Sequence, residues 1–282
     1  MLTPNLVSRI VETALGEDAP WGDLTVELTT PEAAFVATRL VAREAGVFAG
    51  GPLIEETFRQ VDPRVTVTEL VAEGTPFIAG DVLAQIAGPA RGVLTGERVA
   101  LNFSQRMSGI ATLTSHFVAA VAHTGARIAD TRKTTPGLRA LEKHAVRAGG
   151  GSNHRFSLSD AIMVKDNHLA ALGADDAAST TAALAGLRER AGHTTAIVVE
   201  VDRLEQIEPV LAARPTGILL DNFTTDELRA GVALIGDRAI VEASGGVTID
   251  TVVGIAEAGV DVISVGQLTH GARALDLGLD AA

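Results

Sequence analysis

A concentration of basic side chains lies between Asp130 and Arg155, in a chain whose formal net charge is −12. This segment, DTRKTTPGLRALEKHAVRAGGGSNHR, holds six lysine and arginine residues and only two carboxylates. Arginine presents paired donors in a fixed plane that match a carboxylate or a phosphate, and lysine adds a compact charge. A solvated helix face is the usual explanation of a charge run. In an acidic chain the segment also indicates a site for a small anion, and Arg132, Lys133 and Arg155 are the strongest candidates.

Charged residues also end several short apolar runs further along the chain. Lys165, Glu200 and Asp221 each stand at or just after the end of such a run, as does Glu242 in AIVEASGG. Two carboxylates beside a phosphate would repel it. Glu200 and Asp221 therefore indicate either Mg²⁺ held largely through water and phosphate oxygens, or stabilisation of a developing cationic carbon. The alternative is that each carboxylate simply pairs with a nearby lysine or arginine.

Glycines follow the last two apolar runs, in EASGGVT and SVGQLTH. The backbone amides of Gly245, Gly246 and Gly266 can approach an anion closely because no side chain intervenes. Such turns often only reverse the chain, but the last two strands of a β/α barrel commonly hold a phosphate group. A sugar phosphate is therefore the expected ligand of these turns.

The histidines do not indicate a metal site. His154 and His168 have no histidine partner at helical spacing, and the sequence contains no HExxH motif. We expect His154 to contact an anion or the substrate, whereas His168 and His270 are either contacts or structural groups. The absence of cysteine excludes disulfides, thiolate metal sites and a cysteine nucleophile.

The apolar runs themselves predict the scaffold that positions these residues. They are ARIAD, DAIMVKD, TAIVVEVD, GILLDN, AIVEASGG and DVISVGQ, and from the second run onward they recur every 21 to 35 residues with helical patterns between most of them. Continuous apolar runs at this spacing are typical of parallel strands in βα units, buried on both faces. Six runs, where a closed barrel has eight, predict an open or incomplete β/α barrel with its site at the carboxyl ends of the strands.

The first half of the chain predicts an antiparallel sheet with helices, an N-terminal α+β sandwich domain. Alternating and amphipathic patterns predict three strands and two helices, over 34–43, 65–70, 82–86, 6–15 and 52–60. A long helical pattern then runs over 91–123, with an expected break near Ser108 and Gly109. The predicted domains are residues 1–108, including the connecting helix, and 109–282, with a C-terminal tail that packs back on the first domain.

The basic segment contains a predicted helix of its own. Thr135 is the expected N-cap and Pro136 the first helical residue. Arg139, Lys143 and Arg147 then recur every four residues and form one stripe, whose members are either functional or a solvated face. Their individual roles stay open.

Composition narrows the class of protein. An apolar fraction of 46% with 21% charged residues is ordinary for a globular enzyme. The uncharged stretch over 107–126 contains too many polar groups for a membrane span, so we expect no membrane association. The N-terminus has no pattern of a signal peptide, which predicts a cytoplasmic protein. The negative net charge opposes nucleic-acid binding outside the basic segment.

Together, these motifs resemble the quinolinate phosphoribosyltransferases. The resemblance rests on DTRKTTPGLRALEKHAVRAGGGSNHR, MVKDNH, VEVD, LLDN, EASGG and SVGQLTH, in this order, and extends to GDLT, AREAGVFAG and LTGERVALNFSQRMSGIAT. It covers nearly the whole chain. Ala243, Met163 and Gln267 depart from the family pattern, and Gln267 affects the expected phosphate contact.

The resemblance implies an enzyme of de novo NAD biosynthesis. It would transfer ribose 5-phosphate from phosphoribosyl pyrophosphate (PRPP) to quinolinate, with Mg²⁺, and release pyrophosphate, CO₂ and nicotinate mononucleotide. Homodimers with shared sites are implied, in which the partner subunit supplies Arg98, and larger oligomers stay open. Lys133, Glu200 and Asp221 would be catalytic, and the two carboxylates would hold Mg²⁺ through water and PRPP. The implied substrate-binding residues are Arg98, Thr131, Arg132, Lys133, His154, Arg155, Lys165, Glu200, Asp221, Ser244, Gly245, Gly246, Val265, Gly266, Gln267 and His270.

Two other functions stay open from the residues alone. A nicotinate-type phosphoribosyltransferase would use a monocarboxylate and ATP, and would need fewer cations for its acceptor. A non-catalytic module that binds RNA or another polyanion would use the basic segment, but no aromatic stacking platform lies near that segment.

Overall fold

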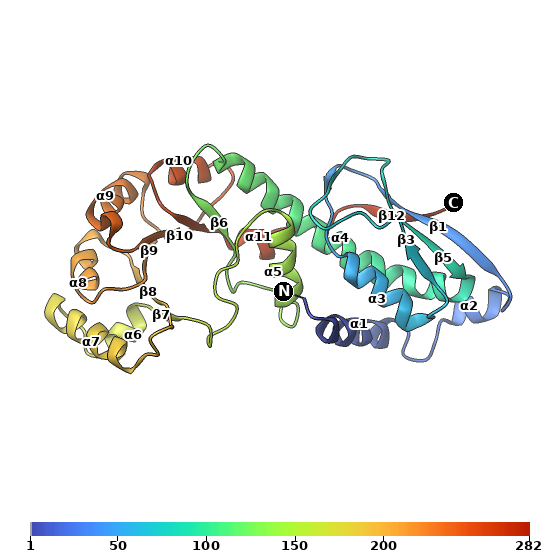
Figure 1. Cartoon of the computed structure of the whole chain (residues 1–282), viewed down its shortest axis with the longest axis horizontal. Helices are drawn as coiled ribbons and strands as arrows, with labels where there is room; N and C mark the ends of the chain where they lie inside the picture. The colour runs from blue at the N-terminus through green and yellow to red at the C-terminus, as the bar shows by residue number, and fades with distance from the viewer. Residues whose placement is uncertain (1) are drawn as a thin grey trace. The chain divides into compact units, whose positions relative to one another are not determined.

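The computed structural model describes residues 2–282, which divide into two compact units. The first unit comprises the chain up to Ser115 together with Thr135–Gly150 and Gly271–Ala282. The second comprises His116–Thr134 and Gly151–His270. Figure 1 shows the consequence for the first unit, in which the red C-terminal strand lies beside the blue N-terminal strand β1.

The first unit contains an antiparallel sheet of four strands in the order β12-β1-β5-β3. These strands are β1 (Phe35–Ala42), β3 (Thr66–Thr68), β5 (Val82–Pro89) and β12 (Leu277–Ala281). The three alternating runs of the first half thus form strands, as predicted. The sequence did not indicate β12 or the small pair β2 (Gly46–Val47) and β4 (Pro76–Phe77), because such short segments carry little periodicity.

Helices complete the first unit. The predicted helices are present as α1 (Pro4–Asp18) and α3 (Gly51–Val61). A further short helix, α2 (Leu24–Thr29), begins within GDLT, where the Asp23 carboxylate accepts a hydrogen bond from the Val26 backbone N–H at 3.0 Å. An aspartate in that position is a standard N-cap, so the motif starts a helix rather than only a turn.

The long helix α4 (Ala90–Val121) runs without interruption, so the expected break near Ser108 and Gly109 is wrong. Gly109 lies where another segment of the first unit passes close to the helix, since a Cβ there would be 1.9 Å from the Arg273 carbonyl oxygen. Ser108 is also used for packing, because its hydroxyl bonds to the Ala49 backbone. Both residues serve close packing and do not end the helix.

The helix of the basic segment begins later than predicted. α5 (Arg139–Ala148) has Leu138 at its N-cap position, and Thr135 and Pro136 precede it. Gly137, which lies between Pro136 and Leu138, has φ +81°, a left-handed conformation that interrupts an α-helix. The predicted cap at Thr135 is therefore wrong.

The second unit contains six parallel strands in the order β6-β11-β10-β9-β8-β7. They are β6 (Arg127–Ala129), β7 (Ile162–Val164), β8 (Ile197–Val201), β9 (Gly217–Asp221), β10 (Ile240–Ser244) and β11 (Val262–Ser264). Each apolar run predicted as a strand is one. Within residues 2–282, β6 and β7 form the two edges of this sheet and do not pair with each other, which confirms an open β/α barrel.

Helices follow the strands of the second unit, as the βα pattern predicts (Figure 1). They are α6 (Asp166–Ala171), α7 (Ala177–Arg190), α8 (Ile207–Ala212) after a 3₁₀ turn at Leu204–Gln206, α9 (Thr225–Ile235), α10 (Val252–Glu257) and α11 (Gln267–His270). The short helices α6 and α11 were not predicted. Among residues 2–282, no helix, α4 included, combines the length and the apolar surface that crossing a bilayer requires.

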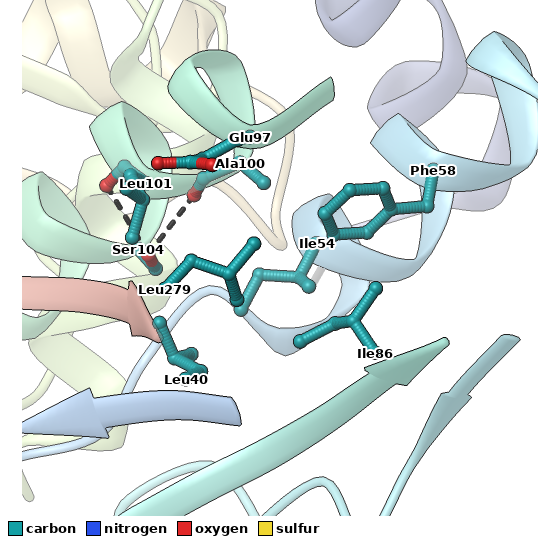
Figure 2. A pocket seen from close by; sticks show the side chains of 9 residues that line it. All are labelled: Leu40, Ile54, Phe58, Ile86, Glu97, Ala100, Leu101, Ser104 and Leu279. Atoms are coloured by element: carbon teal, nitrogen blue, oxygen red, sulfur yellow. Dashed lines mark hydrogen bonds between the residues drawn. The ribbon is translucent and has the colours of Figure 1, made fainter. Parts of the chain in front are cut away.

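A small pocket lies within the first unit, between its sheet and helices α3 and α4 (Figure 2). Its lining is almost entirely apolar, and the residues are Leu40, Ile54, Phe58, Ile86, Glu97, Ala100, Leu101, Ser104 and Leu279. The Ser104 hydroxyl donates to the Ala100 carbonyl of its own helix. With one carboxylate and no cation in its lining, this pocket does not suit a small anion, so it is not the predicted site.

Candidate active site

The predicted site residues of the second unit follow the strand ends, as expected for a parallel sheet. They are Thr131, Arg132 and Lys133 after β6, Lys165 after β7, Glu200 in β8, Asp221 and Ser244 at the ends of β9 and β10, and Val265 and Gly266 after β11. His154 and Arg155 come from the connection between β6 and β7. Ser152 forms a parallel bridge with Ala129 of β6, which brings this connection alongside the strand.

A buried carboxylate organises that connection. Asp130 is 0% exposed. It accepts a hydrogen bond from the Asn153 side-chain amide at 2.6 Å and one from the His154 backbone N–H at 2.8 Å. Charged hydrogen bonds of this kind are strong, and burial strengthens them. Asp130 therefore fixes the backbone immediately before Arg155.

Arg132 and Arg155 form a pair of cations with unmet demand for an anion. Burial lowers the pKa of the Arg155 guanidinium and the nearby positive charge of Arg132 lowers it further, whereas the Asp160 carboxylate partly opposes this shift. The Arg155 guanidinium donates a hydrogen bond to the Ala161 carbonyl at 3.0 Å. The Nε of Arg132 is buried and has no hydrogen-bond partner among residues 2–282. A buried donor without an acceptor is rare and costly, and a ligand with an acceptor oxygen would satisfy Nε of Arg132.

His154 is held by the protein at both ring nitrogens. Its Nδ1 accepts the Arg155 backbone N–H at 2.7 Å, and its Nε2 lies 3.4 Å from an oxygen of Glu242. A backbone N–H can only donate, so Nδ1 is unprotonated and the ring proton is on Nε2. Glu242 is buried, and it also accepts a hydrogen bond from the Ser264 hydroxyl. Glu242 thus lies below the rim and orients His154.

Lys165 and Glu200 form an ion pair at the ends of β7 and β8. For Glu200, the simple pairing with a lysine is therefore what the structure contains. The Lys165 backbone N–H donates to Nδ1 of His168 at 2.9 Å, at the start of α6. The sequence left open whether His168 contacts a ligand or is a structural group. This bond gives it a structural role.

The ends of β9 and β10 form a turn that requires glycine. Gly245 has φ +98° and Gly246 φ +58°, and a Cβ on Gly245 would lie 2.1 Å from Oδ1 of Asn222. The Asn222 backbone N–H donates to the Ser244 carbonyl at 2.9 Å, and its side-chain amide donates to Asp221 at 2.8 Å. The turn is therefore fixed, and its glycines leave the backbone accessible to an anion.

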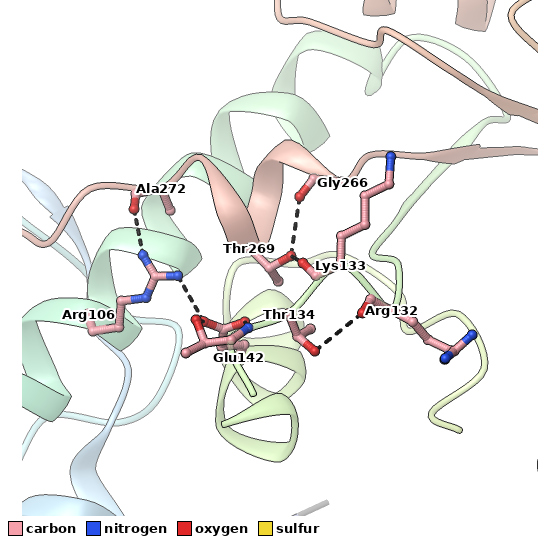
Figure 3. Close-up of polar contacts among 9 residues, drawn as sticks. Arg106, Arg132, Lys133, Thr134, Glu142, Gly266, Thr269 and Ala272 are labelled. Carbon is pink, nitrogen blue, oxygen red and sulfur yellow. Dashed lines mark hydrogen bonds and ion pairs between the residues drawn. The ribbon is translucent and has the colours of Figure 1, made fainter. Parts of the chain in front are cut away.

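Lys133, Gly266 and His270 lie together at the ends of β6 and β11. A Cβ on Gly266 would be 3.0 Å from Cδ of Lys133 and 3.2 Å from Nε2 of His270, so both side chains pack against this glycine. Figure 3 shows the Lys133 side chain extending past Gly266. Val265 is buried and its N–H donates to the Ala129 carbonyl at 2.8 Å, whereas Gln267 is exposed at the start of α11.

The remaining cations belong to the first unit. Arg98 is an exposed residue of α4. On α5, Lys143 is only 1% exposed, so the reading of a solvated stripe is wrong for this residue, whereas Arg147 is exposed. The neighbouring Glu142 is fully buried and pairs with Arg106 at 2.8 Å (Figure 3). Glu142 is buried where α5 packs against α4 at Arg106, within the first unit.

The carboxylates do not build a metal site from protein ligands alone. No group of three or more histidine, aspartate or glutamate residues suited to a metal ion occurs in the described part of the chain. Glu200 is paired with Lys165, and Asp221 is half-buried at the end of β9. Two carboxylates such as Glu200 and Asp221 suit Mg²⁺, which usually keeps several waters and is bound by one or two carboxylates and substrate phosphates.

Several polar residues of this region were not among the predicted site residues. They are Asp130, Ser264 and Thr269, all buried. A carboxylate directly after an apolar run, as in IAD, is the signal that could have found Asp130. For Ser264 and Thr269 the sequence holds no such signal, because a hydroxyl is common in both buried and exposed positions.

Comparisons with known proteins agree with this architecture. The family model of the quinolinate phosphoribosyl transferase N-terminal domain matches residues 23–108, and that of the C-terminal domain matches residues 110–280. The probable nicotinate-nucleotide pyrophosphorylase [carboxylating] of Bacillus subtilis is 43% identical over 94% of this chain and 89% of its own length. The nicotinate-nucleotide pyrophosphorylase [carboxylating] of Mycobacterium leprae is 43% identical over 96% of this chain and 95% of its own length.

Solved structures match over the full chain. The crystal structure of NadC from Streptococcus pyogenes has a TM-score of 0.94 at 38% identity and covers 100% of this chain and 98% of that one. The nicotinate-nucleotide pyrophosphorylase from Francisella tularensis has a TM-score of 0.93 at 32% identity, with the same coverage.

Proposed function

The chain belongs to the quinolinate phosphoribosyltransferase family, and we propose that it transfers ribose 5-phosphate from PRPP to quinolinate with loss of CO₂, in de novo NAD biosynthesis. The products are nicotinate mononucleotide, pyrophosphate and CO₂. The observation that carries this proposal is the Arg132 and Arg155 pair, with a buried donor that lacks a partner and a lowered Arg155 pKa. Such a pair suits a dicarboxylate better than a singly charged acceptor.

Quinolinate carries two carboxylates on one edge of its ring. Arg132 and Arg155 bind these carboxylates, and each charged hydrogen bond contributes about 1.5–3 kcal/mol. His154 and Lys165 complete the contacts on the same rim. Lys165 then shares its charge between the substrate and Glu200, with which it pairs in the absence of ligand.

PRPP binds beside quinolinate, at the ends of the neighbouring strands β6, β11 and β10. Lys133 and the backbone at Gly266 contact its pyrophosphate, and the turn with Ser244, Gly245 and Gly246 contacts its 5-phosphate or ribose. Thr131, Val265, Gln267 and His270 border the same site. The positive φ angles of both turn glycines and the exposed Lys133 side chain support this assignment.

The chemistry needs placement more than proton transfer. The pyridine nitrogen of quinolinate is unprotonated at neutral pH, so its lone pair attacks ribose C1 directly as the C1–O bond to pyrophosphate breaks. Glu200 and Asp221 stabilise the positive charge that develops on the ribose, and Lys133 neutralises the departing pyrophosphate. The quaternised ring then accepts the electrons of the breaking C–C bond as CO₂ leaves, and the ring carbon takes up a proton.

Mg²⁺ is the proposed cofactor. Glu200 and Asp221 would hold it, largely through water and PRPP oxygens, and it would supply positive charge that neutralises the leaving pyrophosphate. We further propose a homodimer in which Arg98 of the partner subunit completes the site.

Turnover assays with purified protein test the proposal. Quinolinate with PRPP and Mg²⁺ is expected to release CO₂ and pyrophosphate in equal amounts, and removal of the metal by a chelator is expected to stop both. Nicotinate in place of quinolinate is the matched comparison, because it lacks one carboxylate. Turnover of nicotinate with no turnover of quinolinate would contradict the proposal.

A further inference from the structure

The hydroxyl group of Thr269, a residue of α11, contacts the backbone of Lys133. Its Oγ1 lies 2.6 Å from the Lys133 carbonyl oxygen and 3.2 Å from the Gly266 carbonyl oxygen (Figure 3). A hydroxyl has a single proton, and the shorter distance assigns this proton to the Lys133 carbonyl. Thr269 is 0% exposed, so water does not compete for the bond.

A second threonine holds the other backbone group of the same lysine. The Lys133 backbone N–H donates to Oγ1 of Thr131 at 3.0 Å. Both backbone polar groups of Lys133 are thus bound by threonine hydroxyls, while its side chain is exposed at the end of β6. The position and direction from which the Lys133 side chain starts are therefore fixed by these two bonds.

Gly266 limits where the lysine stem can lie. Its missing side chain leaves just enough space for Cδ of Lys133, which is 3.0 Å from the position of a Cβ. Nε2 of His270 also lies close to that position, at 3.2 Å. A change in the Lys133 backbone would push the stem against these neighbours or away from them.

We propose that Thr269 is a positioning residue, which fixes the Lys133 backbone so that the ammonium group meets the pyrophosphate of PRPP. The identity of this ligand rests on the proposed function. The placement of Lys133 by Thr269 rests on the contacts above. Thr269 itself is buried and does not touch the substrate.

Two substitutions separate the effect of the Thr269 hydroxyl from the effect of the side-chain volume. Thr269→Val keeps the shape and removes the donor, whereas Thr269→Ser keeps the donor. Calorimetry with inorganic pyrophosphate and Mg²⁺ is expected to give a Kd about tenfold higher for T269V, below the roughly 100-fold cost of a full ångström of misplacement, and a Kd near wild type for T269S. KM for PRPP should follow the same order, with KM for quinolinate unchanged.

Thr57→Val is the matched control. Thr57 is also 0% exposed, and its Oγ1 donates to the Leu53 carbonyl at 2.7 Å within α3. The Thr57→Val substitution therefore removes a buried threonine hydroxyl, as Thr269→Val does, but in the first unit. We expect no change in pyrophosphate affinity for T57V.

A double-mutant cycle distinguishes positioning from a purely structural role. In a K133A background, T269V should cause no further loss of pyrophosphate affinity, because the ammonium group that it positions is already gone. An equal loss in both backgrounds would overturn the proposal, as would an unchanged Kd for T269V alone. Should T269V fail to fold, Thr269→Ala enters the same cycle with the same two outcomes.

Failure of this inference is distinguishable from failure of the proposed function. A wild-type protein that turns over quinolinate, together with a T269V variant of unchanged pyrophosphate affinity, contradicts the inference alone. A wild-type protein inactive on quinolinate contradicts the proposed function, and the pyrophosphate cycle still decides the role of Thr269.

Discussion

Single residues of the second unit divide into two groups, buried carboxylates and rim cations. Asp130 and Glu242 are buried, and they hold the backbone and the ring of His154. Arg132 and Arg155 lie at the strand ends with incomplete partners. The buried carboxylates have partners within the protein, so they do not neutralise the cations, which can bind a ligand. Residue types at the strand ends predicted the cations, but their pairing needed the tertiary structure.

Arg132→Ala tests the rim cations. The variant should raise KM for quinolinate about tenfold to a hundredfold, because each charged hydrogen bond lost costs about 1.5–3 kcal/mol. Its free energy of unfolding should not fall, since the buried Nε without a partner is removed. Steady-state kinetics and urea denaturation measure both quantities.

Arg127→Ala is the control for this change. Arg127 is an exposed residue at the opposite end of β6, so its loss should leave KM for quinolinate unchanged. The same KM in R132A and wild type would refute the assignment of Arg132.

Secondary-structure elements were predictable where the sequence carries a clear hydrophobic pattern. The six apolar runs of the second unit are all strands, because strands buried on both faces need uninterrupted apolar sequence. The errors arose where a local signal was outweighed by packing. The sequence predicts a helix break at Gly109, but this glycine accommodates the Arg273 carbonyl. The sequence also indicates that Lys143 is solvated, but Lys143 is buried. Such partners are distant in sequence, so no local pattern contains them.

The segment before β12 is attached to the first unit through Glu44. Its carboxylate pairs with Arg273 and accepts the Asp276 backbone N–H at 2.9 Å. The hydrogen bond from Arg273, followed by that from Asp276, lowers the pKa of Glu44 to about 2. A carboxylate with a lowered pKa stabilises the folded state above its unfolded pKa and loses this effect as the pH falls toward the folded value.

Glu44→Gln therefore has a pH-dependent effect on stability. At neutral pH it should lower the free energy of unfolding by about 0.5–1 kcal/mol, a value kept small because the Arg273 side chain is 69% exposed. The difference from wild type should shrink as the pH falls from about 4.5 to about 2. Denaturation at several pH values measures this difference. Glu55→Gln, at an exposed position of α3, is the control, and a constant difference for E44Q would contradict the assignment.

The whole molecule is built from interleaved segments of one chain. The first unit takes residues from three separate stretches, and the second from two. Every predicted site residue except Arg98 belongs to the second unit. Sequence patterns identified both sheets and predicted a C-terminal tail that packs back on the first domain, but the return of the chain to the first unit through α5 could not be deduced from periodicity. Because Arg98 alone belongs to the first unit, its role is tested separately, as a residue that serves a second subunit.

Hybrid dimers test the shared site. At quinolinate concentrations well below KM, Arg98→Ala and Arg132→Ala proteins should each have little activity alone. If each site takes Arg98 from the partner subunit, random mixing gives hybrids with one intact site and recovers about a quarter of wild-type activity. Turnover of quinolinate before and after denaturation and refolding of the mixture measures the recovery.

A mixture of Arg132→Ala with Arg155→Ala is the control, since both residues belong to one subunit's site and no hybrid contains an intact one. Absence of recovery in the first mixture would mean that Arg98 acts within its own chain.

The pairing of β12 with β1 also affects how the protein is made. β1 is synthesised early, yet its neighbour at residues 277–281 leaves the ribosome only after all of the second unit. Until then one edge of β1 has unpaired backbone groups, a template for association with other nascent chains. Truncation by a premature stop codon shortly before Leu277 would thus expose that edge permanently, and the product should be prone to aggregation and proteolysis although every predicted active-site residue is present.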